Sequence, residues 1–429
     1  MLPPIQHAGL YLSGFFEYEK QKLQEPAFNE VFAHNDYFER SKEYFEQKYF
    51  PNWLQTLYPQ GPKAMNAIGL GTLQSNHLVK QNICSVPRSI TVKGKTLQFV
   101  ISKVELHIFR ENLGLFTIAI QTGEDITFET VADLVYGLRN TTDNQKYTNT
   151  NPLFAFIESD IIPFVHTSTA GWRKLNPQLK AFLNIDTKTS FKTGKEWNDI
   201  LTDLTTASPL YTIGHKTIHD FHGTYYQKLL ANNVLNVFHN WRTMILFDNV
   251  VRISINLKEE DRNNMWENEY ITIYIFILYI QLYLFRMHKE LGKVSSNSSK
   301  AASLRDEFIH FRHDFDLSQI SYKFLPNEIF KKLIQVLEIT QEINRIDEKI
   351  NRIDTSIREK KESKIERLLL FLTTITSLSV IWDSSSLLVA VLGYKEDSPG
   401  YPNLLLKIAS SLLVVFGLIG ISVYRRWKR

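Results

Sequence analysis

The chain has 429 residues, of which 44% are hydrophobic and 22% are charged, so it is long enough to hold two or more structural units with buried cores. Its 49 Lys and Arg residues exceed its 45 Asp and Glu residues by only four, which argues against a nucleic-acid-binding protein. The single cysteine, Cys84, excludes an intrachain disulfide and a cysteine-based zinc site, and it fits a reducing compartment.

Residues 1–255 have the pattern of a mixed α/β (α+β) cytoplasmic domain. The N-terminus lacks a basic segment followed by a continuous apolar stretch, so we expect no signal peptide. Turn residues at Lys93–Lys95 and Glu111–Gly114 divide a stretch rich in β-branched and aromatic residues into a strand meander. In chain order we expect a helix over 38–58, strands over 89–122, a helix over 126–142 and a short strand within 151–164.

Residues 224–251 have helical spacing and predict one helix, and 256–325 predict a helical region with a flexible linker at 292–303, where Ser and Lys are frequent. The uncharged run Tyr270–Phe285 would be about 24 Å long as a helix, short of the roughly 30 Å hydrocarbon core of a membrane. We therefore expect a buried cytoplasmic helix here; the alternative is a membrane span.

Residues 326–367 predict a long stalk helix. Pro326 suits a first helical turn, and neither Gly nor Pro follows until Gly393, so a single helix is expected. Isoleucines three and four apart form a coiled-coil seam, and Ile at both seam positions favours oligomers larger than dimers. The alternative is a stripe packed on the chain's own domain. The seam consists of Ile339, Ile343, Ile346, Ile350, Ile353 and Ile357.

Two apolar stretches near the C-terminus are long enough to cross a bilayer. Residues 368–392 contain one charged residue, Asp383, and residues 404–423 contain only Lys407. The outer loop, 393–403, is short, so the spans would form a hairpin. Basic residues precede the first span and fill the tail, 424–429, which by the positive-inside rule predicts cytoplasmic N- and C-termini and a multi-pass protein of the inner membrane.

The first span carries a polar face, whereas the second is almost wholly apolar. Helical spacing places five polar residues on one side, and in a ring of such helices they would line a water-filled path that favours cations. The alternative is that the hydroxyls join helices and the carboxylate pairs with a basic group. These residues are Thr373, Thr376, Ser377, Asp383 and Ser384.

A mixed α/β region, a stalk helix entering the first of two spans, a short outer loop and a basic tail together resemble the CorA family of divalent-cation transporters. The likeness covers residues 326–429 and, more weakly, 103–121. It implies a homopentamer whose first span lines the pore. At the outer mouth Gly393, Tyr394 and Lys395 stand where that family carries Gly-Met-Asn, and a ring of lysines would repel a divalent cation.

Absence of that motif makes the chain more similar to the CorA-like membrane effectors of type III CRISPR systems. This resemblance implies an antiviral channel opened by a small nucleotide of the S-adenosylmethionine–AMP type, which binds the cytoplasmic part at a site not yet assigned. The alternatives are a divergent Mg²⁺/Co²⁺ transporter of the CorA family and a membrane-anchored coiled-coil scaffold. No covalently bound cofactor and no direct nucleic-acid contact are expected, whereas a divalent cation is a candidate ligand.

Three histidines, His215, His219 and His222, are spaced to share one helix face and could hold a transition metal, although such residues more often lie on the surface or in polar networks. Asp306, His310 and His313 repeat the spacing. The sequence contains no phosphate-binding loop, nucleophile elbow or HExxH motif, so we do not expect an enzyme.

Overall fold

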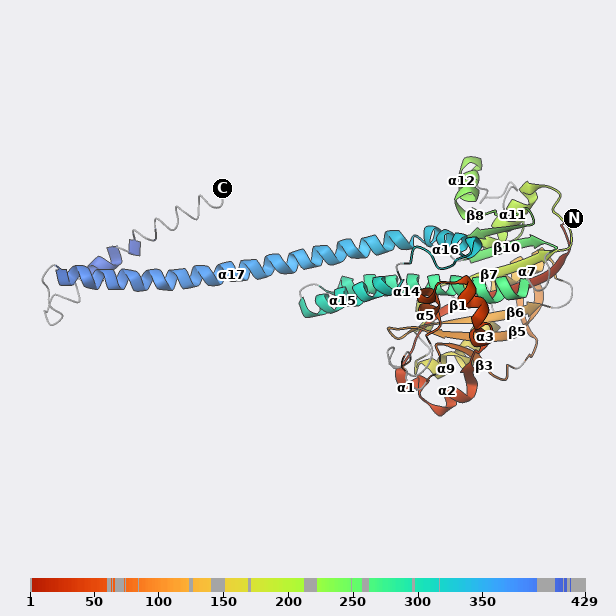
Figure 1. The fold of residues 1–429 in the computed structure, drawn as a ribbon, viewed down its shortest axis with the longest axis horizontal. Coiled ribbons are helices and arrows are strands. Elements are labelled where there is room, and N and C mark those ends of the chain that lie inside the picture. The colour runs from red at the N-terminus through yellow and green to blue at the C-terminus, as the bar shows by residue number, and fades with distance from the viewer. Residues whose placement is uncertain are drawn as a thin grey trace. The chain divides into compact units, whose positions relative to one another are not determined.

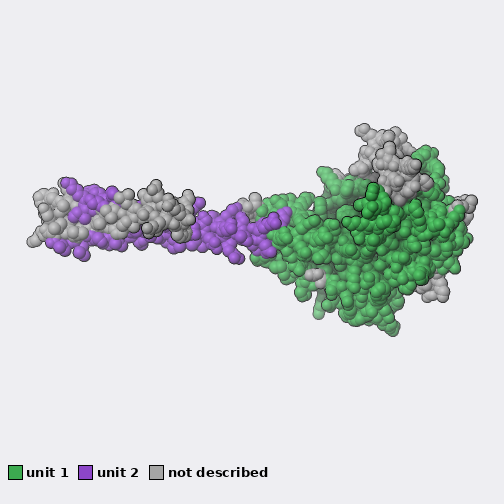
Figure 2. Space-filling model, turned by 90° about the horizontal axis from the view of Figure 1, so that it is seen from above, with its two compact units in different colours: residues 1–295, 302–348 green, residues 296–301, 349–429 purple. Residues whose placement is uncertain are grey.

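The computed structural model describes residues 2–391 except 60–62, 64, 66–72, 74, 84, 123–125, 140–150, 169–170, 212–221, 248, 257–261, 295–297 and 316, together with 406–411, 413–414 and 417. Two units are distinguished (Figure 2): unit 1 comprises 1–295 and 302–348, and unit 2 comprises 296–301 and 349–429. Unit 1 therefore includes the expected α/β domain, 1–255, most of the expected helical region, 256–325, and residues 326–348 of the expected stalk helix.

A ten-stranded sheet is the centre of unit 1 (Figure 1). Its strands run in the order β2-β3-β5-β6-β1-β7-β10-β9-β8, with β4 paired to β5. The β7–β10 pair is parallel and the other pairs are antiparallel. The bounds are β1 Ile5–Glu17, β2 Phe32–His34, β3 His77–Lys80, β4 Arg88–Val92, β5 Lys95–Ile108, β6 Leu113–Thr122, β7 Lys180–Thr187, β8 Val234–Leu235, β9 Trp241–Ile245 and β10 Asn249–Ile255.

The two faces of the sheet differ in polarity. On β5, Val104, Leu106 and Ile108 join the main apolar core, while Glu105 and His107 between them point to the other face, because successive side chains of a strand alternate. The same alternation on β7 and β10 places Asn184 and Arg252 on this second, polar face. The sheet is thus apolar on one side and, although buried, unusually polar on the other.

Helices cover the apolar face, and their starts follow from local capping. The side chain of Asn151 accepts a hydrogen bond from the backbone of Leu153 ahead of α8, and that of Thr193 accepts one from Glu196 ahead of α11. The core on this side includes residues of α7 Phe128–Arg139, α8 Pro152–Asp160, α9 Ile162–Val165, α10 Trp172–Leu175 and α11 Gly194–Thr205.

The remaining short helices of unit 1 lie early in the chain or follow α11. They are α1 Lys20–Leu23, α2 Pro26–Val31, α3 Tyr37–Arg40, α4 Lys42–Lys48, α5 Pro51–Leu57 and α12 Gly223–Asn233. The residues predicted to be helical over 38–58 form three short helices, α3, α4 and α5, and the strand meander is confirmed as β4, β5 and β6. Its turns take the left-handed conformation at Lys93, Gly94, Glu111 and Asn112.

Helix α14 (Ile271–Lys293) covers the polar face, preceded by a π-helical segment, η1 (Arg262–Tyr270). The Tyr274 ring lies against Phe182 of β7, and the Tyr279 ring stacks on Phe109 at the end of β5. Within the predicted run, Tyr270–Leu284 is buried except at Gln281, so the predicted buried helix is confirmed. Helix α15 (Ser298–Phe315) packs on it through Phe311, whose ring centroid lies 3.7 Å from that of Tyr283.

The expected single helix from Pro326 is two helices, α16 (Phe324–Val336) and α17 (Ile339–Val391). They are separated at Leu337 and Glu338, where Glu338 has a φ of 53°. Leu337 and Ile339 are both buried, yet residues two apart lie on nearly opposite sides of a continuous helix. The left-handed residue between them changes the helical phase so that both side chains reach the core.

Three local predictions are wrong. Residues 151–164 form helices α8 and α9 rather than a strand, because Asn151 caps a helix whose first residue is Pro152. The single helix over 224–251 is α12 followed by strands β8 and β9 and the start of β10, because β9 pairs with both β8 and β10 in the sheet. The flexible linker 292–303 is helical at 292–293 and from Ser298, where helix-favouring residues lead into the apolar positions of α15.

Candidate functional site

Helix α17 exposes a long apolar surface in unit 2. Leu368, Leu369, Leu370 and Phe371 have relative exposures of 60%, 56%, 63% and 63%. Among the described residues two helices are long and apolar enough to cross a membrane, within Met265–Lys293 and Ile339–Ser384. The most apolar window of the first is 83% buried in the fold, whereas that of the second is entirely exposed. Only the second presents an apolar surface to its surroundings.

The polar residues predicted on the first span lie on α17. Thr373 and Thr376 donate hydrogen bonds from their hydroxyls to the carbonyls of Leu369 and Leu372 one turn earlier, which satisfies each hydroxyl within its own helix. Asp383 and Ser384 are exposed, and Ser377 is partly exposed. The outer-mouth residues Gly393, Tyr394 and Lys395 lie outside the described residues, as does most of the second span.

The beginning of the isoleucine seam is covered within this chain. Ile339 and Ile346 are 3% and 0% exposed. The neighbouring Glu342 accepts a hydrogen bond at 2.9 Å from His288 of α14, and Asp347 accepts one at 2.6 Å from Arg312 of α15. This first stretch packs as the alternative interpretation predicted. Ile343, Ile353 and Ile357 are partly exposed, while Ile350 is buried.

The histidine group predicted as a metal site is not assembled by the described residues. His215 and His219 lie outside them, and His222 is an exposed residue that precedes α12. On α15, Asp306, His310 and His313 are exposed, as expected of a solvated helix face.

A cleft of about 410 Å³ opens in unit 1 where α5, the end of β5, α14 and α15 meet. The stacked rings of Phe109 and Tyr279 form part of its wall, with centroids 4.0 Å apart. Asn76, which is 2% exposed, donates to the Leu57 carbonyl, but its side-chain oxygen has no hydrogen-bond partner among the described residues. The other polar lining residues include Asn52, Gln55, Thr56, Arg110, His313 and Asp314.

The cleft combines the groups that bind a small polar aromatic molecule. Flat aromatic walls accept a planar ring, and the unpartnered oxygen of Asn76 can accept a hydrogen bond from an amino group. Arg110 lies at the rim, paired with Asp314 at 2.6 Å, and could attract an anionic group. Sequence reasoning missed this site because its lining comes from segments far apart in the chain.

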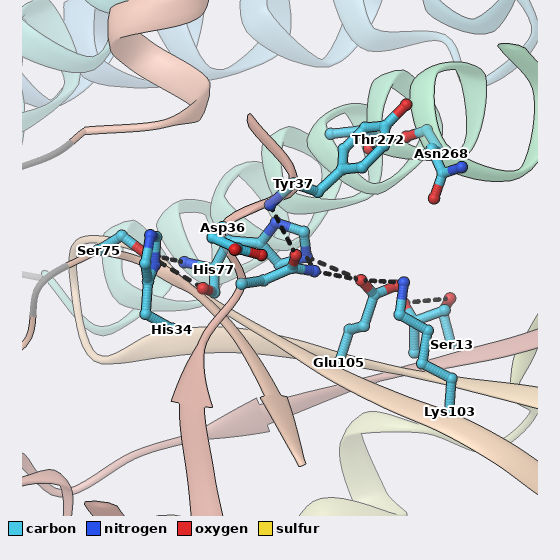
Figure 3. A network of polar contacts seen from close by, with 12 residues as sticks. Ser13, His34, Asp36, Tyr37, Ser75, His77, Lys103, Glu105, Asn268 and Thr272 are labelled. Atoms are coloured by element: carbon cyan, nitrogen blue, oxygen red, sulfur yellow. Dashed lines mark hydrogen bonds and ion pairs between the residues drawn. The ribbon is translucent and has the colours of Figure 1, made fainter. Parts of the chain in front are cut away.

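A second polar site lies between β3, β5 and α14 (Figure 3). Glu105 Oε1 is within hydrogen-bonding distance of three nitrogens: Asn35 Nδ2 at 2.8 Å, His77 Nε2 at 3.0 Å and Lys103 Nζ at 2.8 Å. The ring of His107 stacks on that of His77 at 4.4 Å. We call His77, Glu105 and His107 the buried triad; their exposures are 7%, 8% and 5%.

The surroundings of the triad favour an ionised Glu105 carboxylate beside a neutral His107 imidazole. Burial alone would raise the pKa of Glu105, but the charge of Lys103 and the hydrogen bond and charge of His77 outweigh it and hold that pKa well below its usual value. Burial, assisted by repulsion from His77, lowers the pKa of His107 well below the usual value. The sequence Glu105-Leu106-His107 could have indicated part of this site, because residues two apart on a strand lie on the same face of the sheet.

A partly buried carboxylate, Glu267 of η1, organises the same polar face. It accepts hydrogen bonds from Tyr11 at 2.7 Å and Asn184 at 2.9 Å, and it lies 2.5 Å from His7. Gly9 of β1 leaves the space that this carboxylate occupies, because a Cβ there would collide with it. Glu267 thus ties η1 to β1 and β7.

A scan against protein-family models found no matching family, and a search of curated proteins found no similar sequence.

Proposed function

We propose that the protein is a CorA-like, membrane-anchored oligomeric channel whose cytoplasmic domain binds a small nucleotide ligand. The exposed apolar stretch of α17 is the observation that carries this proposal. Consecutive large apolar side chains on an isolated helix are unfavourable in water, so lipid or other copies of the helix must cover them. Membrane insertion would cover these side chains with lipid. A helix can enter lipid because its backbone groups are hydrogen-bonded within the helix.

The polar face of α17 supports a conducting path rather than a simple anchor. A carboxylate at the centre of a span costs about 3 kcal/mol on insertion scales, so Asp383 requires a compensating environment. A water-filled path at the centre of a ring provides one, and Thr373, Thr376, Ser377 and Ser384 would extend it along the helix. A ring of carboxylates would favour cations over anions.

Basic residues support an orientation with the folded domain in the cytoplasm. Lys360, Lys361, Lys364 and Arg367 are exposed on α17 immediately before the apolar stretch, and further arginines and lysines end the chain. Positive charge on both flanks fits a hairpin with both ends on the cytoplasmic side. In this arrangement unit 1 would meet cytoplasmic ligands.

For the ligand site we propose the cleft walled by Phe109 and Tyr279. An adenine ring could lie against the aromatic wall formed by Phe109 and Tyr279, its amino group could reach Asn76, and Arg110 at the rim could receive a phosphate. This chemistry supports a nucleotide messenger of the S-adenosylmethionine–AMP type and, with it, a role as an antiviral effector of a type III CRISPR system.

Ion release from liposomes tests the proposal. The full chain is reconstituted in vesicles loaded with K⁺, and K⁺ release is recorded with and without the S-adenosylmethionine–AMP conjugate, with Mg²⁺ uptake recorded in parallel. We expect release that depends on the nucleotide. Mg²⁺ uptake without nucleotide would identify a transporter, and the absence of any flux would identify a membrane-anchored scaffold.

A further inference from the structure

We propose that the buried triad of His77, Glu105 and His107 is a binding site for a divalent transition-metal ion of the zinc type. This inference is independent of the membrane function proposed above, because it rests only on residues of the sheet in unit 1. It also differs from the histidine group at 215–222 in its place in the sequence and in ligand chemistry.

The strand register builds the triad. His77 of β3 lies directly opposite His107 of β5, and Glu105 lies two residues before His107, on the same face of the sheet. One ligand atom from each residue lies within 4.8 Å of the other two. Ligands of a tetrahedral zinc ion, at about 2.0–2.1 Å from the metal, lie roughly 3.4 Å apart. Coordination would bring the three atoms closer together and would turn the stacked rings of His77 and His107 so that their nitrogen lone pairs converge on the ion.

The donor set matches the proposed metal. Two imidazole nitrogens and one carboxylate oxygen form a combination that binds zinc and similar first-row ions with one position left for water or another ligand. Neither ring nitrogen of His107 has a hydrogen-bond partner within the described part of the chain. Because His107 lines the pocket beside the triad, it can offer a lone pair to an ion there without breaking an existing bond.

The surroundings of the triad can support a bound ion. Asn35 donates to Glu105 and would hold the carboxylate in place as it coordinates. A metal would take the place of the hydrogen bond between His77 and Glu105 and would displace Lys103, whose side chain is 38% exposed and whose ammonium can turn toward solvent. Asn268 and Thr272 close the pocket from the side of η1 and α14, so a metal here would stabilise the contact between the sheet and these helices.

Cobalt titration of the full chain in mild detergent, after treatment with a chelator, tests the site. Co²⁺ bound by imidazole and carboxylate in a low-symmetry site gives visible absorption bands that Zn²⁺ removes by competition. We compare the wild type with His107→Gln and Glu105→Gln, and with His310→Gln, an exposed histidine on α15, as the matched control. The unfolding midpoint is measured with and without Zn²⁺.

We expect each triad variant to lose one bound metal per chain and more than about 100-fold in affinity, since removing a ligand costs more than removing a residue that supports one. Zn²⁺ should raise the unfolding midpoint of the wild type and of His310→Gln only. Unaltered Co²⁺ spectra in both triad variants, or a wild type that binds neither ion, would overturn the proposal.

Lys103→Ala provides a second test that does not depend on the triad variants folding. It leaves all three ligands in place and removes the ammonium that competes for Glu105. The proposal predicts tighter Co²⁺ and Zn²⁺ binding than in the wild type, by about 10-fold if one charge-assisted contact is relieved. Unchanged or weaker binding would contradict it.

Discussion

The guanidinium of Arg110 lies 2.6 Å from the carboxylate of Asp314, and this ion pair joins the end of β5 to α15 at the rim of the proposed ligand cleft. The Arg110 side chain is 47% exposed, so the pair itself adds little to stability, and the residue is available to a ligand.

Replacement of Arg110 should therefore impair ligand binding more than folding. We expect Arg110→Ala to weaken binding of the S-adenosylmethionine–AMP conjugate by about 10- to 100-fold, the range for a lost hydrogen bond to a charged group. Isothermal titration calorimetry measures this. Arg40→Ala, which breaks an exposed pair with Asp36 away from the cleft, is the control. Equal affinity of Arg110→Ala and wild type would remove the cleft as the nucleotide site.

The isoleucine seam has a first part that packs within unit 1 and a later, partly exposed part that could form contacts between copies of the chain. Ile346 is fully buried within unit 1, so Ile346→Asn should lower the free energy of unfolding by about 3 kcal/mol. Ile353 and Ile357 are partly exposed, so the double variant with Asn at both positions should dissociate the proposed oligomer while the stability of unit 1 is retained.

Native mass spectrometry in detergent measures the effect of each variant on assembly, and chemical unfolding measures its effect on stability. Asn351→Ala, at an exposed position on the same helix, is the control for assembly. An intact oligomer in the Ile353 and Ile357 double variant, or a wild type that is monomeric, would show that this part of α17 is not an interface.

Glu307 of α15 should make stability depend on pH. Burial and the nearby Glu111 carboxylate raise the pKa of Glu307 above its ordinary value, despite the charge of Arg286. The folded chain thus holds this proton more tightly than the unfolded chain, and the stabilising contribution is lost as pH rises from about 4.5 through the raised pKa. The contribution to stability is small, because the Glu307 side chain is 25% exposed and water screens its interactions.

The variant Glu307→Gln removes this titration. Its free energy of unfolding, relative to wild type, should increase between about pH 4 and pH 7, because only the wild type ionises over that range. Urea unfolding at several pH values measures the difference. A difference that stays constant with pH would mean that Glu307 has the same pKa in both states.

The orientation in the membrane is tested by cysteine labelling. Wild type carries only Cys84, which should be protected from an impermeant maleimide in intact cells, whereas Ser398→Cys, in the proposed outer loop, should be labelled. Lysed cells provide the control for reactivity of both thiols. Labelling of Cys84 but not of the Ser398→Cys thiol in intact cells would reverse the orientation and place unit 1 outside the cytoplasm.

Periodic features could be predicted from the sequence, whereas features that depend on distant contacts could not. The meander of β4 to β6 and the buried helix α14 follow from alternation, turn residues and hydrophobic length. The break at Glu338 does not, since it exists only because Leu337 and Ile339 must reach one core. The start of α8 at Asn151 and Pro152 could have been predicted from the sequence, but the apolar residues that follow favoured the prediction of a strand.

The candidate sites show the same division. Helical spacing alone places the polar residues of α17 on one face. The buried triad required the pairing of His77 with His107, and no local pattern in either strand specifies that register. The cleft required α5, β5, α14 and α15 to meet, which depends on tertiary packing.

The reversal potential of nucleotide-activated currents in an asymmetric KCl gradient tests the central claim most directly. Wild-type channels should prefer cations, and Asp383→Asn should move the reversal potential toward that of a nonselective path while the protein still inserts, because the substitution removes a ring of charge. Thr376→Val, on the polar face, should alter conductance, and Thr374→Val, off that face, should not. A conducting Asp383→Asn channel with the reversal potential of the wild type would contradict a path lined by α17.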